Sequence, residues 1–431
     1  MKREIEVMAP AGSRAALSAA LRAGADSVYF GVGELNMRAR AAANFARADL
    51  RRVVRCCHAC GASAYLTLNV VMYDDELEEM RELCREALRA GVDAVIASDI
   101  SVIEYAHSIG LPVHVSVQAN VCNCAAVRFF AQYADVMVLA RELRLPQIRR
   151  IVETVRREGI TGPSGGLVRM EVFAHGALCV AISGKCFMSL AAYNSSANLG
   201  ACYQVCRRAY RVSDAETGFE LEIDNQYVMS PRDICTIRVV DQLLDAGISV
   251  LKIEGRGRSE DYVSTVTAVY REAVDAWRRG IFSEEAALEW ENRLRRVYNR
   301  GFWQGGYYLG EPWEAWSGGS DSRAFERRLH AARVTRYYAR QNVAELCLEA
   351  SGLACGQTIL ICGPSTGALR TEIAELRLDV DGQTLSVSSA PKGSTVCVAV
   401  PRRVRRNDRV YLAQPRRLDR ENRSADGEEG A

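Results

Sequence analysis

The chain has 431 residues, of which 48% are hydrophobic, so it is long enough for a large domain with a substantial core and a second, smaller domain. Its formal net charge is only +2, so the overall charge does not indicate a nucleic-acid partner. Such a partner would need a local basic patch. Fifteen cysteines, with neither an apolar leader nor a bilayer-length apolar run, predict a cytoplasmic protein whose thiols stay free or bind metal.

Eight short apolar runs recur along the first 253 residues, and most are separated by helical patterns such as 75–89 and 145–156. Strands that alternate with helices indicate parallel βαβ units, and eight of them predict an α/β fold, a (β/α)8 barrel of the TIM type. An open, doubly wound sheet is the alternative. The predicted strands are Ile5–Met8, Ser27–Phe30, Ala64–Leu68, Ala94–Ala97, Val113–Val115, Val136–Leu139, Met170–Phe173 and Val250–Ile253.

The spacing of these runs also predicts the domain organisation. The gap before the eighth strand is long enough for a lid or a cofactor-binding insertion, with a strand-like stretch at 219–230 and a helix around 234–244. Beyond residue 330, short strands broken by turn residues predict a small antiparallel β barrel. The predicted parts are the barrel at 1–258 with its insertion at 176–247, a helical extension and linker at 259–330, the β domain at 331–415 and a polar tail at 416–431.

Polar residues follow nearly every predicted strand, at the end of the barrel where this fold places its catalytic face. Alternation along the fifth strand would put His114, Ser116, Gln118 and Asn120 on one face, pointing into the barrel mouth. Amide side chains can read the edge of a base, and serine or histidine can assist proton transfer. A packed core position is the alternative for His114.

Several charged residues also follow the predicted strands. Arginine binds carboxylates in a bidentate manner, so a group of arginines at the barrel mouth suits an anionic metabolite. Arg141 and Arg256 are the strongest candidates, unless the neighbouring glutamates hold them as ion pairs. The charged candidates are Arg38, Arg40, Arg141 and Arg256, with Glu142 and Glu254 as acid–base or ion-pair partners.

The insertion carries four cysteines with the spacing C-x6-C-x15-C-x3-C, namely Cys179, Cys186, Cys202 and Cys206. This spacing is wider than the paired C-x2-C knuckles of a zinc ribbon, so it favours an iron–sulfur cluster. Unligated, buried thiols are the alternative. His175 lies close to the first cysteine in the chain and could tune such a cluster through a hydrogen bond.

The run from Glu171 to Ser189, E-x-F-x-x-G-A-L-C followed by G-x-C-x-x-S, resembles the signature of the collagenase-like peptidase family. The segments MAPAG, GADSVYFG, HVSVQANV, ARELRL and LKIEGRGRS are also similar to that family. HGALC, SVQAN and ACYQVC fit best the branch that acts in tRNA modification. Membership of that branch implies formation of 5-hydroxyuridine at the anticodon wobble position, in a pathway that depends on prephenate.

The resemblance also implies cofactors and partners. Relatives that bind a cluster hold a 4Fe–4S cluster with four cysteines, of which Cys179, Cys186 and Cys202 match here; Cys206 is the expected fourth ligand by proximity, and Cys235 competes with it. Prephenate, a dicarboxylate, would be the co-substrate, and tRNA and a related protein of the family would be partners. A peptidase and a non-catalytic RNA-binding protein are the alternative functions.

The C-terminal end is rich in arginine, which suits the phosphate backbone of tRNA, although a solubilising tail would have the same composition. The arginines of this stretch are Arg402, Arg403, Arg405, Arg406, Arg416 and Arg417.

Overall fold

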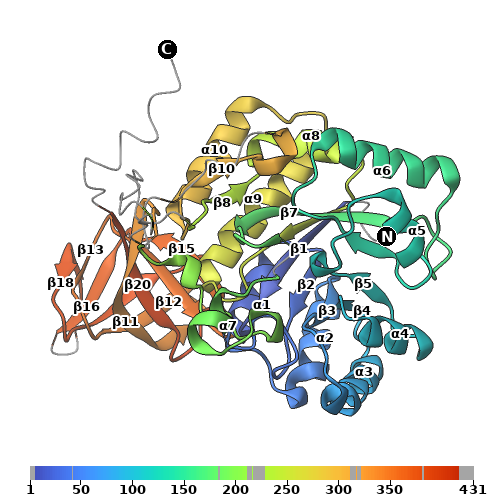
Figure 1. The fold of residues 1–431 in the computed structure, drawn as a ribbon. Helices are drawn as coiled ribbons and strands as arrows, with labels where there is room; N and C mark the ends of the chain where they lie inside the picture. Colours follow the sequence, from blue (N-terminus) through green and yellow to red (C-terminus); the bar gives the residue numbers. More distant parts are fainter. Residues whose placement is uncertain are drawn as a thin grey trace.

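The computed structural model of the chain describes residues 5–40, 42–182, 185–210, 216, 229–310, 317, 322–380 and 383–416. An α/β barrel and a C-terminal antiparallel β domain lie side by side (Figure 1). Most of the predicted strand at 219–230 and the tail beyond residue 416 lie outside the described residues. No helix in the described part of the chain is long and apolar enough to cross a membrane.

Eight parallel strands close the barrel, because β9 pairs with β1 on one side and with β7 on the other. Each predicted strand is confirmed to within a few residues, and the closure excludes the open sheet. The barrel strands are β1 (Glu6–Ala11), β2 (Ser27–Phe30), β3 (Ser63–Leu68), β4 (Ala94–Ala97), β5 (Val113–Val115), β6 (Val136–Val138), β7 (Arg169–Ala177) and β9 (Val250–Ile253).

Helices alternate with these strands and cover the outside of the barrel. Short polar side chains fix where several of them begin: the side chain of Ser13 accepts a hydrogen bond from the amide of Ala16, and that of Asn123 from the amide of Ala126. The helices are α1 (Arg14–Arg22), α2 (Leu50–Ala59), α3 (Leu77–Ala90), α4 (Ile100–Ser108), α5 (Cys124–Phe130), α6 (Leu145–Glu158), α8 (Val240–Asp245), α9 (Glu260–Arg278) and α10 (Glu284–Arg296).

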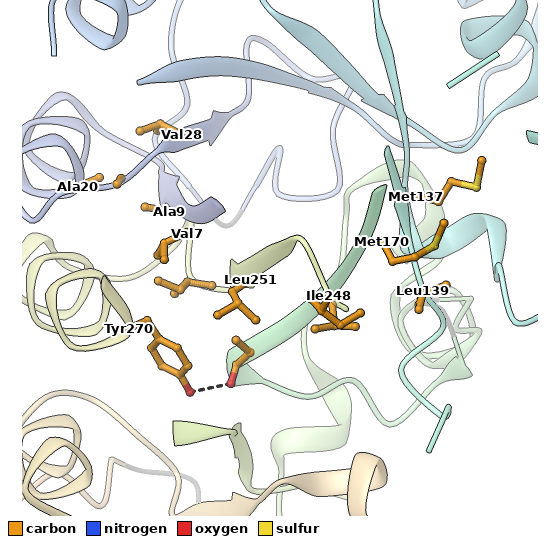
Figure 2. Packing of buried hydrophobic residues seen from close by; sticks show 14 of the residues in the cluster. Val7, Ala9, Ala20, Val28, Met137, Leu139, Met170, Ile248, Leu251 and Tyr270 are labelled. Carbon is orange, nitrogen blue, oxygen red and sulfur yellow. Dashed lines mark hydrogen bonds between the residues drawn. The ribbon is translucent and has the colours of Figure 1, made fainter. Parts of the chain in front are cut away.

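The strands are buried on both faces, which explains their nearly continuous apolar sequences. One core fills the space between strands and helices, where Val7, Ala9 and Leu251 pack against the helical layer (Figure 2). Tyr270 of α9 donates a hydrogen bond of 2.8 Å to the carbonyl oxygen of Ala174, which fastens this helix to β7.

The insertion between β7 and β9 differs from the prediction. The predicted helix at 234–244 is wrong at its start, because residues Asp233–Cys235 form strand β8 and α8 begins only at Val240. β8 pairs antiparallel with the end of β7, and β10 (Phe302–Gln304), within the stretch predicted as a helical extension and linker, pairs parallel with β8. β7 extends past the barrel rim, and the paired strand satisfies backbone groups that would otherwise form an open edge.

The C-terminal domain is antiparallel, as predicted, and has its own apolar core. Its main sheet has the strand order β15-β14-β20-β11-β12-β19-β16-β17, and β13 pairs with β18 separately. The strands are β11 (Glu326–Tyr338), β12 (Val343–Leu348), β13 (Leu353–Ala354), β14 (Thr358–Gly363), β15 (Gly367–Glu372), β16 (Leu376–Val380), β17 (Gln383–Val387), β18 (Ser389–Ala390), β19 (Thr395–Ala399) and β20 (Arg409–Pro415).

The β domain docks on the barrel through the turn before β15. The hydroxyl of Ser18 in α1 donates to the carbonyl oxygen of Pro364 at 2.6 Å, and Arg328 forms an ion pair of 2.8 Å with Asp261 of α9. Arg402 donates to the carbonyl oxygens of Thr366 and Ala368, so this arginine of the basic stretch holds the docking turn. Its neighbours Arg403, Arg405 and Arg406 are exposed.

Gly12, which follows β1, lies against the loop that carries Arg256. A Cβ atom at this position would stand 1.9 Å from the carbonyl oxygen of Arg256, so Gly12→Ala must move that loop. We expect the free energy of unfolding to fall by about 1–3 kcal/mol, measured by urea denaturation. Gly166→Ala is the control, because its Cβ would meet only the Ser164 hydroxyl at 3.6 Å. Equal stability of the two variants would contradict this constraint.

Candidate active site at the barrel mouth

A cavity of about 130 Å³ lies at the carboxyl ends of the barrel strands, where TIM barrels place their active sites. The barrel supplies one part of its wall, and residues 179–210, here called the cysteine segment, supply the rest. The barrel residues that line it include Tyr29, Arg38, Thr67, Asn69, Ile96, Ser116, Gln118, Arg141, Phe173, Lys252, Glu254 and Arg256.

Besides the competing ligand Cys235, the sequence predicts fifteen site residues, and the structure brings ten of them together. The ten that line the cavity are Arg38, Ser116, Gln118, Arg141, Glu254, Arg256, Cys179, Cys186, Cys202 and Cys206. The five that do not line it are Arg40, His114, Asn120, Glu142 and His175.

The prediction that alternation continues from His114 to Asn120 is wrong. β5 ends at Val115, and a 3₁₀ turn follows, which leaves Asn120 in the left-handed conformation with φ of 54°. The ring of His114 is buried and packs 4.5 Å from that of Tyr65. Ser116 and Gln118 still reach the cavity, where the Ser116 hydroxyl donates to the amide oxygen of Gln118.

His175 lies in the core and not at the cavity. Its ring packs among those of Tyr262, Tyr270 and Phe302, at centroid distances of 5.4–6.0 Å. Burial lowers its pKa to about 3, so the imidazole is neutral at physiological pH. The described lining of the cavity therefore does not include the His175 ring, although its carbonyl oxygen accepts a hydrogen bond of 2.8 Å from the amide of Glu254.

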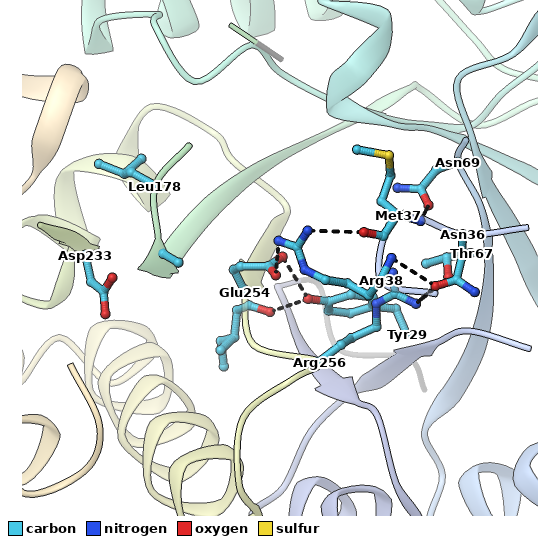
Figure 3. Close-up of polar contacts among 12 residues, drawn as sticks. Tyr29, Asn36, Met37, Arg38, Thr67, Asn69, Leu178, Asp233, Glu254 and Arg256 are labelled. Atoms are coloured by element: carbon cyan, nitrogen blue, oxygen red, sulfur yellow. Dashed lines mark hydrogen bonds and ion pairs between the residues drawn. The ribbon is translucent and has the colours of Figure 1, made fainter. Parts of the chain in front are cut away.

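One ion pair organises the cavity wall (Figure 3). Arg38 donates to Glu254 at 2.9 Å, and the hydroxyl of Tyr29 donates to the carbonyl oxygen of Ile253 at 2.9 Å, with the Glu254 carboxylate 3.4 Å away. Burial raises the pKa of Glu254, but Arg38, Arg141 and Arg256 together outweigh it and lower that pKa to about 2. Glu254 is therefore ionised at any physiological pH.

Arg256 is a buried cation with neutral partners. It is 4% exposed, and its Nη1 donates to Asn36 and Thr67 at 2.9 Å each (Figure 3). Burial lowers its pKa to about 10, which still leaves it protonated at neutral pH. Among the described residues no carboxylate forms an ion pair with Arg256, because Glu254 pairs with Arg38. A buried guanidinium of this kind suits an anionic ligand.

Arg141 lines the same cavity and lies close enough to Glu254 to lower the pKa of that carboxyl. Its guanidinium carbon is 4.0 Å from the centre of the Phe173 ring, and Nη1 donates to the carbonyl oxygen of Ala177 at 3.3 Å. The aromatic face holds the cation in a fixed position without neutralising it. Arg141 therefore supplies a second positive charge to the cavity.

Lys252 was missed by the sequence analysis. Its ammonium forms an ion pair of 2.7 Å with Glu171, and both side chains are almost fully buried, at 6% and 0% exposure. The ammonium also lies 4.8 Å from the centre of the Tyr29 ring. One signal was present in the sequence: Lys252 interrupts a strand that should be apolar, and Glu254 and Arg256 follow at alternate positions just after it.

The four cysteines of the segment all line the cavity. Burial, together with the neighbouring thiols of Cys179, Cys202 and Cys186, outweighs the opposing charge of Arg207 and raises the pKa of the Cys206 thiol to about 11. No three histidine, cysteine, aspartate or glutamate side chains already form a metal-binding group in the part of the chain described. The donor set fits a cluster: four soft thiol ligands face one space.

Cys235, the competing fourth ligand, lies elsewhere. It is buried in β8 near the hydroxyl of Tyr270 and does not line the cavity. Burial raises the pKa of its thiol to about 12, as it also raises that of the Cys206 thiol, so the two cysteines differ in position and not in acidity. The geometry favours Cys206 as the companion of the other three, and metal binding by this group stays a prediction.

Comparison of the chain with known proteins identifies its family. The family model described as "Peptidase family U32" matches residues 12–318. The chain belongs to peptidase family U32. The resemblance of its signature at Glu171–Ser189 to collagenase-like peptidases is thereby confirmed. Some relatives of this chain are named as hydrolases and others as RNA-modification proteins.

Three relatives in family U32 are informative. A "Collagenase" of Porphyromonas gingivalis is 46% identical over 408 residues, which cover 95% of this chain and 97% of the relative. "tRNA hydroxylation protein P1" of Bacillus subtilis is 32% identical over 68% of this chain and 69% of its own length. A 23S rRNA 5-hydroxycytidine synthase of Escherichia coli is 34% identical over 63% of this chain and 39% of its own length.

The Lys252–Glu171 pair gives a stability prediction. Lys252→Met leaves the Glu171 carboxylate buried without its cation, and we expect a loss of about 3–5 kcal/mol in the free energy of unfolding. The double variant Lys252→Met, Glu171→Leu should recover most of it, since a well-packed apolar pair often replaces a buried ion pair at little cost. Urea denaturation of both single variants and the double variant measures the coupling; additive losses would contradict it.

Glu254 gives a pH dependence. Its pKa falls from the usual 4.5 to about 2 on folding, so the stabilisation is complete above pH 4.5 and is lost as the pH falls toward 2. That shift corresponds to roughly 3 kcal/mol. Urea denaturation of cluster-free protein between pH 6 and 3 should show a steeper loss for the wild type than for Glu254→Gln. Parallel curves would show that Glu254 has an ordinary pKa.

Proposed function

We propose that this protein hydroxylates C5 of a pyrimidine in tRNA, with the wobble uridine as the substrate and 5-hydroxyuridine as the product. The observation that carries the proposal is one cavity that gathers four thiols with Arg38, Arg141 and Arg256. Two relatives are named for RNA hydroxylation, one acting on tRNA and one forming 5-hydroxycytidine in rRNA, which supports a pyrimidine C5 as the target.

The thiols would hold the redox cofactor. Conversion of C5–H to C5–OH is a two-electron oxidation, and protein side chains lack the oxidising equivalents it needs. We propose that Cys179, Cys186, Cys202 and Cys206 bind a 4Fe–4S cluster, which supplies electron-transfer chemistry when bound. Arg207, whose Nη2 donates to the carbonyl oxygen of Leu178 at 2.7 Å, lies close to these thiolates and would offset their charge.

The arginines would bind a carboxylate co-substrate. Arg256 is buried against the neutral acceptors Asn36 and Thr67, and Arg141 lies over Phe173, so both cations remain available to a ligand. Prephenate, which carries two carboxylates, is the co-substrate that we propose for this pair. The guanidinium donors would fix its orientation, and the closed barrel interior beneath them would exclude water.

Amide groups would orient the base. The Gln118 Nε2 donates to the carbonyl oxygen of Asn69 at 2.8 Å, and the two amide side chains lie 3.4 Å apart at the cavity wall. Amides in this position can read the edge of a pyrimidine. Glu254 is a poor general base because its pKa is about 2, so we assign it to holding Arg38 in place and not to proton transfer.

A peptidase mechanism has less support from the site. A hydrolase of this kind needs a nucleophile next to a base, or a metal-bound water. No histidine is among the described residues that line the cavity, and the Ser116 hydroxyl contacts an amide and not a base. The name "Collagenase" belongs to the relative, and a gelatin-hydrolysis assay on the purified chain provides the direct comparison.

Nucleoside analysis tests the chemistry. A strain that lacks the gene should lose tRNA 5-hydroxyuridine, and the wild type should restore it, whereas Cys186→Ala and Cys206→Ala should not, because each removes one of the four thiol ligands. Cys235→Ala is the matched control: it is buried outside the cavity and should restore the nucleoside. Anaerobically purified wild type should contain about four irons per chain.

Unchanged 5-hydroxyuridine in the deletion strain would contradict the proposed reaction. Zinc without iron or sulfide in anaerobic protein would contradict the cluster. If Cys206→Ala restored 5-hydroxyuridine and Cys235→Ala did not, Cys235 and not Cys206 would be the fourth ligand. Gelatin cleavage by the wild type that Cys186→Ala abolishes would favour the peptidase instead.

A further inference from the structure

The rim of the cavity carries exposed aromatic side chains that none of the roles above uses. Phe187, Tyr193 and Tyr203 are 76%, 44% and 45% exposed. All three belong to the cysteine segment, where Phe187 follows Cys186 and Tyr203 follows Cys202. Large aromatic rings that gather at the mouth of a cavity, in place of being scattered, indicate a binding surface.

Arginines lie over these rings. The guanidinium carbon of Arg208 is 5.1 Å from the centre of the Tyr193 ring, and that of Arg40 is 5.7 Å from the centre of the Tyr203 ring. The two tyrosine rings are 5.1 Å apart. Arg208, Tyr193, Tyr203 and Arg40 therefore form a continuous row, here called the aromatic–arginine rim.

The charge of this region has one sign. Residues 185–210 contain Lys185, Arg207 and Arg208 but no aspartate or glutamate. Arg40 comes from the opposite wall, in the loop after β2, and its Nη1 donates to the Tyr203 hydroxyl at 2.5 Å. The rim thus crosses from the cysteine segment to the barrel and presents cations beside flat apolar faces.

The backbone holds the rim in place. The amide of Tyr203 donates to the hydroxyl of Ser189 at 3.0 Å, and Ser189 is buried. Gly200, with φ of 80°, packs so closely on the loop after β2 that a Cβ there would stand 2.3 Å from the carbonyl oxygen of Asn36. A surface fixed in this way loses little conformational entropy when a ligand binds.

We propose that the aromatic–arginine rim binds the single-stranded loop of an RNA, with bases stacked on Tyr193 and Tyr203 and phosphates contacted by Arg40 and Arg208. The proposal rests on the proposed function and adds the means by which the substrate reaches the site. Aromatic faces accept any unpaired base, and interleaved arginines follow the backbone. Paired bases have no free faces, so the rim selects a loop over a duplex.

The test measures RNA binding by fluorescence anisotropy with the full chain, purified anaerobically. The probes are an RNA hairpin with a uridine-rich single-stranded loop and a fully paired RNA duplex of equal length. We expect Tyr193→Ala and Tyr203→Ala each to raise the Kd for the hairpin about tenfold, and to leave that for the duplex unchanged. Tyr193→Phe should bind like the wild type, because its ring face is retained.

The arginine variants have a separate readout. Arg40→Ala and Arg208→Ala should each lower the slope of log Kd against log salt by about 0.7, the loss of one phosphate contact on a single strand. Phe129→Ala and Arg150→Ala are matched controls, exposed on the far helices α5 and α6, and should change neither the Kd nor the slope. Thermal unfolding and iron content show whether each variant keeps its fold.

Several results would overturn the proposal: a wild type that does not bind the hairpin, equal losses for hairpin and duplex, or no loss in folded tyrosine variants. Loss of binding to a denatured collagen peptide, with RNA affinity unchanged, would assign the rim to a protein partner. If the rim variants keep their affinity while cells form 5-hydroxyuridine, the rim proposal alone fails. If they lose affinity while cells never form the nucleoside, the proposed reaction fails.

Discussion

Pairing of β9 with both β1 and β7 is the constraint on which the rest of the molecule depends. It closes the barrel between the first and the last strands, so that residues more than two hundred positions apart become neighbours. Arg38 meets Glu254, and Arg256 meets Asn36 and Thr67, only because of that closure. A barrel closed in this way has a packed interior that excludes water and an end that is open to solvent. The charged side chains lie where the two meet.

The charge balance at that boundary is the main chemical property of the site. Four cations, Arg38, Arg141, Arg256 and Lys252, face two carboxylates, Glu171 and Glu254. An uncompensated buried cation destabilises a protein, so a fold that buries Arg256 without an ion-pair partner and keeps the half-buried Arg141 beside the same cavity has a site suited to anions. The thiols on the opposite wall would add negative charge when a metal deprotonates them, and the cations would then also stabilise that group.

Family membership leaves the reaction open, because one fold supports many chemistries and the relatives carry both hydrolase and hydroxylation names. The choice between these reactions therefore depends on the chemistry of the residues in the site. Its described lining offers thiols, guanidinium groups and amides but no histidine, a set suited to holding a cofactor and an anion. The aromatic rings and arginines at its entrance suit a polyanion, just as the cations inside the cavity suit a small anion.

Local sequence pattern by itself determined the eight barrel strands, the antiparallel strands after residue 330 and the spacing of the four cysteines, because periodicity and turn residues act over a few positions. Tertiary structure decided the rest. β8 forms where a helix was predicted because β7 offers it an edge, and the face of His114 ends at a 3₁₀ turn. Glu254 pairs with Arg38 and leaves Arg256 its neutral partners, and Lys252 finds Glu171 across the barrel. These pairings depend on contacts between strands that are far apart in the chain. A short stretch of sequence contains no information about such contacts.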